Sequence, residues 1–81
     1  MAFPLKIFSL EREIFVGNAK SLSVPTVNGQ IQVLPEHAAL VTLLKAGEVV
    51  AETEDGTTHK IPIAGGTVEV NEHEVVALVN F

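Results

Sequence analysis

The side chains that could do bond chemistry are few in this 81-residue chain, and their spacing matches no common catalytic set. The only aspartate, Asp55, precedes a glycine, and such a pair is typical of a turn in which the carboxylate accepts hydrogen bonds from the nearby backbone. Ser9, Ser21 and Ser23 lack the Gly-x-Ser-x-Gly frame that presents the nucleophile of many hydrolases. We therefore expect no catalytic residues and no enzymatic activity.

Metal and phosphate chemistry are also poorly supported. His37, His59 and His73 lie far apart in the sequence, without the short spacing that places two imidazoles on one ion. The acidic residues around His73, from Glu69 to Glu74, lack the closely spaced Asp and Asn of a calcium loop. Gly65-Gly66 has no Walker-type frame and favours a bend or a close backbone approach. We expect no metal and no cofactor.

Composition and charge narrow the class of protein further. Hydrophobic residues make up 47% of the chain and charged residues 19%, which is typical of a folded domain, and the length suits a single domain over residues 1–81. The formal charge of −5 and the scattered basic residues argue against nucleic acid and anionic lipid as partners. There is no cysteine for a disulfide, and the sequence has neither a signal peptide nor a membrane-spanning apolar run, so no direct membrane insertion is expected.

The elements that must position any site read as β-strands. Alternation of apolar and polar residues predicts strands around Leu22–Val24, Ile31–Val33 and Val68–Val70. Two alternating runs within Glu48–Ile63 flank Asp55-Gly56, a pair that tolerates positive φ, and predict a hairpin. A second hairpin is predicted for Thr67–Val79, with a left-handed residue in the turn Asn71-Glu72-His73.

Two segments leave alternatives open. The leucine spacing in Glu36–Lys45 fits a helix or a bent strand equally well. In the last segment Val75, Ala77 and Val79 alternate with Val76 and Leu78, so the strand is apolar on both sides. Such a strand is either central in a sandwich or half covered by a partner.

Two stretches of the chain resemble a known family, the N-terminal β-sandwich domain of the ATP synthase ε subunit (F-type, F1 sector). Asn28–Leu44 is similar to the family pattern G-x-L-G-I-L-P-G-H-A-P-L-x-T, although Glu36 and Ala39 stand where the family has Gly and Pro. Gly65–Leu78 is similar to its pattern G-G-x-x-E-V-x-x-x-x-V-x-x-L. The resemblance covers essentially the whole chain and shows the two motifs in the family's order and spacing.

The resemblance implies a flattened all-β sandwich of about ten short strands, with Glu36–Lys45 extended and no C-terminal helical hairpin. It implies one surface packed on the γ subunit, and a loop, matching Asn28, Gly29, Gln30, Ile31 and Gln32, against the ring of membrane c subunits. The positions matching the γ-facing part are Ser9, His37, Leu40, Thr42 and Leu43.

The function implied is that of a non-catalytic rotor part that couples ion-driven rotation to ATP synthesis, without the inhibitory hairpin found in longer members. The protein is then expected as a peripheral subunit at the cytoplasmic face of the cell membrane. The corresponding mitochondrial δ subunit and the chloroplast form share the domain, and the absence of a transit peptide favours a bacterial chain. A free-standing β-sandwich that binds a ligand or metal through the histidines and Glu69–Glu74 is the alternative.

Overall fold

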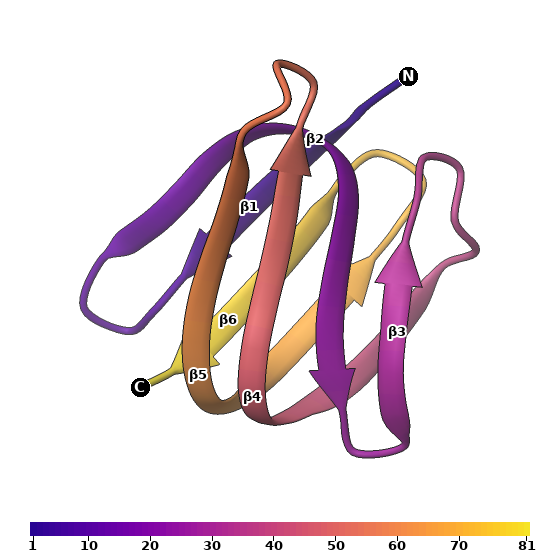
Figure 1. The fold of residues 1–81 in the computed structure, drawn as a ribbon. Helices are drawn as coiled ribbons and strands as arrows, with labels where there is room; N and C mark the ends of the chain where they lie inside the picture. The colour runs from indigo at the N-terminus through magenta and orange to yellow at the C-terminus, as the bar shows by residue number, and fades with distance from the viewer.

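The computed structural model describes all of residues 1–81 and contains six β-strands and no helix. The strands are β1 (Phe3–Phe8), β2 (Glu13–Thr26), β3 (Gly29–Val33), β4 (Leu40–Thr53), β5 (Thr58–Val70) and β6 (Val75–Asn80). They pair in the order β1-β6-β5-β4-β2-β3, and β1 also pairs with β2, which closes the sheet into a flattened barrel (Figure 1). The all-β expectation is confirmed. No helix in the structure is long and apolar enough to cross a membrane.

The expected count of about ten short strands is wrong, because three of the six strands are long and bend. β2 and β4 each span 14 residues and β5 spans 13. The register of β2 shifts between Ala19 and Ser21, so its first half pairs with β1 and its second half with β3. The β4–β5 ladder keeps one register along its whole length, from Leu40 opposite Val70 to Glu52 opposite Thr58. Each bend lets one strand serve both layers of the flattened barrel (Figure 1).

Both expected hairpins are present, but their turns differ in detail from the sequence prediction. At the β4–β5 turn the N–H of Gly56 donates to the carbonyl of Thr53 at 3.0 Å, and Gly56 alone has a positive φ, of 88°. At the β5–β6 turn the side chain of Asn71 accepts hydrogen bonds from the backbone N–H groups of His73 (2.8 Å) and Glu74 (2.9 Å). No residue of that turn has a positive φ, so the left-handed residue expected there is absent.

The ambiguous stretch is extended from Leu40 onward, as the resemblance implied, because β4 begins there. The residues before it form a turn closed by the N–H of His37, which donates to the carbonyl of Leu34 at 3.1 Å. Glu36 lies in this turn at a φ of 67°, the only positive φ outside glycine. Glycine would suit that position better, since a Cβ makes left-handed backbone costly.

The interior is a single cluster of 16 buried apolar residues drawn from all six strands. β6 contributes Val75, Ala77 and Val79, which the alternation placed on one side of the strand and which are each at most 2% exposed. Gly66 allows β5 to bend tightly against β6: a Cβ there would overlap the carbonyl oxygen of Leu78 and lie 2.9 Å from Val79 Cα. The expected role of Gly65-Gly66 in a close backbone approach is therefore confirmed at Gly66.

Candidate functional site

One outer side of the barrel carries apolar side chains that no part of this chain covers. Strand register places Leu43, Thr67, Leu78 and Phe8 in one row across β4, β5, β6 and β1. Leu43 is 59% exposed and Leu78 is 41% exposed, although both lie within regular strands. Isolated exposed leucines are ordinary, but apolar residues that recur in one row of a sheet offer a surface for a partner, here with Thr67 of β5 between Leu43 and Leu78.

A second row runs beside the first. Register places Val41, Glu69, Val76, Lys6 and Val16 side by side from β4 to β2. Val41 is 74% exposed and Val16 is 50% exposed. We call the apolar members of the two rows the outer apolar face: Phe8, Val16, Val41, Leu43, Val76 and Leu78.

Of the five expected γ-facing residues, only Leu43 lies on this surface. Leu43 belongs to the outer apolar face, whereas Leu40 and Thr42 alternate to the inner side, where Leu40 packs against the core. Ser9 directly follows Phe8, and its hydroxyl accepts hydrogen bonds from the N–H groups of Glu11 and Arg12 in the β1–β2 turn. His37 lies at one end of the barrel, in the turn before β4.

The residues that the motif comparison missed on this face are Phe8, Val16, Val41, Val76 and Leu78. For β6 a signal was present, because its two-sided apolar pattern places Val76 and Leu78 on the side opposite to Val75, Ala77 and Val79, and one of the two sides could be covered by a partner. For the others the pairing partners decide the surface, and these are set by the closed strand order rather than by local pattern.

Of the residues expected in a loop that faces the c subunits, only Asn28 lies in the turn between β2 and β3, whereas Gly29, Gln30, Ile31 and Gln32 belong to β3. The hydroxyl of Thr26 donates to the carbonyl of Gly29, and Gly29 has a φ of 119°. Asn28, Gln30 and Gln32 are exposed, whereas Ile31 packs partly against the core. This turn lies at the end of the barrel opposite the β4–β5 turn (Figure 1).

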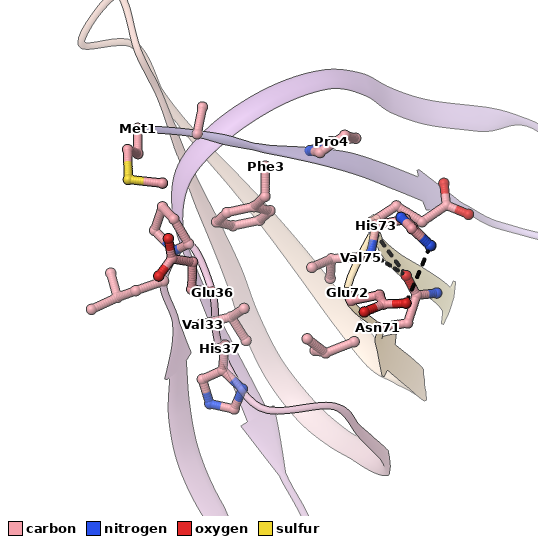
Figure 2. A pocket seen from close by; sticks show the side chains of 15 residues that line it. Met1, Phe3, Pro4, Val33, Glu36, His37, Asn71, Glu72, His73 and Val75 are labelled. Carbon is pink, nitrogen blue, oxygen red and sulfur yellow. Dashed lines mark hydrogen bonds and ion pairs between the residues drawn. The ribbon is translucent and has the colours of Figure 1, made fainter.

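A shallow hollow of about 170 Å³ opens at the other end of the barrel, between the start of β1, the turn before β4 and the β5–β6 turn (Figure 2). This volume is below the roughly 300–1,000 Å³ typical of small-molecule pockets. His37 and His73 both line it, whereas His59 lies elsewhere with its ring 5.0 Å from that of Phe15. No three His, Asp or Glu side chains are placed to share a metal ion.

The only carboxylate with a clearly shifted pKa belongs to the β4–β5 turn. The pKa of Asp55 is lowered to about 2, chiefly because the Thr53 hydroxyl donates to its carboxylate and the Thr57 N–H donates to it as well, at 3.0 Å. These hydrogen bonds favour the ionised form. Asp55 is exposed and has no catalytic partner nearby, so its role is to hold the turn.

Known proteins with the same fold are similar to this chain over nearly its whole length. Residues 2–81 match the family described as the ATP synthase delta/epsilon chain, beta-sandwich domain. The ATP synthase epsilon chain of a Nitratiruptor species is 43% identical over 75 residues, which cover 93% of this chain and 58% of that protein. The epsilon chain of Campylobacter fetus subsp. fetus is 42% identical over 76 residues, or 94% and 59%. The chain thus spans under two thirds of the length of these relatives.

Solved structures show the same fold. A chain of the Euglena gracilis mitochondrial ATP synthase, solved as an OSCP/F1/c-ring assembly, superposes with a TM-score of 0.85 at 25% identity, covering 98% of this chain and 49% of that one. A chain of the Tetrahymena thermophila mitochondrial ATP synthase central stalk and c-ring gives a TM-score of 0.80 at 13% identity, covering 100% and 65%. The second likeness supports the fold alone.

Proposed function

We propose a function for this chain from one premise: it belongs to the ATP synthase delta/epsilon family, whose N-terminal β-sandwich domain its residues 2–81 match. The chain is a non-catalytic part of the central stalk that packs on the γ subunit and rests against the c-ring. It thereby helps to couple ion-driven rotation to ATP synthesis, as a peripheral subunit at the cytoplasmic face of the cell membrane.

The outer apolar face is the observation that carries this proposal. Leu43, Leu78 and Val41 are each more than 40% exposed on one side of a closed barrel, where nothing in the chain shields them from water. Burying a large aliphatic side chain contributes about 1.5–3 kcal/mol, so covering these side chains would stabilise the binding of a partner. None of the six residues of this face lines either hollow of the structure, and an exposed patch without a pocket suits a protein subunit better than a small ligand.

A rotor part must also transmit force without deforming, and the barrel meets this demand. Every strand but β3 pairs along both edges, and one core cluster joins all six strands. The β2–β3 turn projects from one end of the barrel and offers a second contact, for the c-ring, whereas the turns that line the hollow lie at the other end (Figure 1). The similar Euglena chain was solved in an assembly that contains F1 and the c-ring, which supports the c-ring and a part of F1 as partners.

The γ contact is tested by binding of this chain to purified γ subunit from the same source, measured by isothermal calorimetry and co-elution. Leu43→Ser with Leu78→Ser should weaken binding at least tenfold, because both side chains would lose their burial at the interface. Leu10→Ser is the matched control, since Leu10 is 87% exposed and lies outside the face. Unchanged binding of the double variant, with its fold intact by circular dichroism, would contradict the proposal.

His37 is proposed as a further γ contact. Its ring Nδ1 lies 2.7 Å from the carbonyl oxygen of Ala38, which holds the half-buried imidazole in one orientation. His37→Ala should weaken γ binding severalfold without unfolding the barrel. Equal affinity of the variant and the parent chain would remove His37 from the interface.

The c-ring contact is tested by cross-linking, and the absence of cysteine from the chain makes single-site labelling simple. A photoreactive group on Gln30→Cys should cross-link to a c subunit in the assembled complex. The same group on Thr57→Cys, at the opposite end of the barrel, should not (Figure 1). Equal yields at both sites would argue against a specific contact of the β2–β3 turn.

A further inference from the structure

The hollow at the end of the barrel has an apolar floor and an acidic rim. Its floor is formed by Phe3, Val33, Val70 and Val75, each at most 8% exposed, so core side chains lie at the bottom of an open depression. Three carboxylates line it, those of Glu36 and Glu72 at the rim (Figure 2) and that of Glu74. No lysine or arginine side chain lines it, and the only cation among its residues is the amino group of Met1.

The three carboxylates differ in the partners they already have. Glu74 is paired with Lys6 at 3.4 Å, and Glu72 lies 3.4 Å from the ring of His73, which is charged only when protonated. Glu36 takes part in none of the ion pairs of the structure. Glu36 and Glu72 lie on opposite sides of the opening (Figure 2), so one cation placed between them would be attracted by both.

Glu36 is also in an unfavourable backbone conformation. Its φ of 67°, directly after Pro35, is that of the third residue of a type II turn, a position that favours glycine. A carboxylate at this position costs stability that glycine would not. The Glu36 carboxylate therefore lies beside the apolar hollow although glycine would make the turn more stable.

We propose that this hollow receives an arginine side chain of the partner subunit that covers the outer apolar face. The aliphatic stem would lie on the floor of Val33, Val70 and Val75, and the guanidinium would meet Glu36 and Glu72 at the rim and the ring of Phe3. Arginine fits better than lysine because its guanidinium is planar, weakly hydrated and able to bind carboxylates with two hydrogen bonds. The volume of the hollow, about 170 Å³, leaves room for one side chain of this kind.

This inference rests on the proposed function, since the arginine belongs to γ, and the first experiment measures γ binding at several salt concentrations. Glu36→Gln with Glu72→Gln should weaken binding about tenfold and flatten its salt dependence, because two attractive contacts are lost. The matched control is Glu48→Gln with Glu54→Gln, which removes the same charge from exposed residues that do not line the hollow. An equal loss in both pairs, or no loss in either, would overturn the proposal.

Glu36→Gly, compared with Glu36→Gln, separates the effect of the charge from the effect of the turn. It removes the carboxylate and the strain together, so it should weaken γ binding as much as Glu36→Gln, by about threefold, while it stabilises the barrel. Binding equal to that of the parent chain would show that the carboxylate does not contribute.

If the parent chain fails to bind γ, the proposed function fails. A second experiment then tests independently whether the hollow binds an arginine side chain. N-acetyl-arginine N-methylamide is titrated into the labelled chain and followed by amide chemical shifts, with the uncharged citrulline analogue as control. Saturable shifts at Phe3, Val33 and Val75 with the arginine probe alone, lost in the Glu36→Gln, Glu72→Gln chain, would support an arginine site. Absence of such shifts would overturn it.

Discussion

Glu36 is a single residue whose unfavourable backbone conformation is retained in the folded barrel. Its φ of 67° is tolerated because the turn is closed by the hydrogen bond from His37 to Leu34 and the neighbouring Pro35 has a fixed φ. Glu36→Gly should raise the free energy of unfolding by about 0.5–1 kcal/mol, as left-handed backbone is relieved. Urea denaturation measures the change. Glu36→Gln, which keeps the Cβ, is the control and should leave stability unchanged; an equal gain in both variants would contradict the backbone explanation.

Asp55 gives the clearest pH dependence. Its pKa is about 2 in the folded chain, held down by hydrogen bonds from Thr53 and Thr57, and returns to about 4 when the turn unfolds. A lowered folded pKa contributes stability that is fully present above about pH 4 and lost as the pH falls towards 2. The melting temperature should therefore fall less between pH 5 and pH 2 in the Asp55→Asn variant than in the parent chain. Glu54→Gln, beside it but outside these hydrogen bonds, should follow the parent chain.

The bend of β5 shows what decides the architecture at the scale of an element. Gly66 has a φ of 146°, and a Cβ there would overlap the backbone of β6. Gly66→Ala should destabilise the barrel by about 2 kcal/mol or more, because backbone atoms cannot move aside as a flexible side chain can. Gly65→Ala is the matched control, since the nearest atom to its Cβ is the Leu44 carbonyl oxygen at 3.5 Å. Thermal melts of equal midpoint would disprove the close approach.

At the scale of the whole molecule, one core cluster joins all the strands, so the barrel should unfold as a unit. Leu5 is 1% exposed at its centre, and Leu5→Ala should lower the free energy of unfolding by about 2–5 kcal/mol. Amide signals from the β4–β5 turn and from β3 should disappear at the same urea concentration in both chains. Leu10→Ala, at a site 87% exposed, should change stability by under about 0.5 kcal/mol. Separate transitions for the two regions would contradict the single domain expected over residues 1–81.

The sequence by itself determined the strands and the two hairpins, because alternation and turn residues act over a few neighbours. Val75, Ala77 and Val79 were placed together on one side of their strand by period two alone, and the two family motifs identified the sandwich. Three features needed the tertiary structure: the bends that merge the expected short strands into six, the outer apolar face, and the hollow lined by Glu36, Glu72 and Glu74. Each of these three features depends on residues from strands or turns that are distant in the sequence. Which residues meet is fixed by strand order and register, and these depend on packing of the whole barrel rather than on any local pattern.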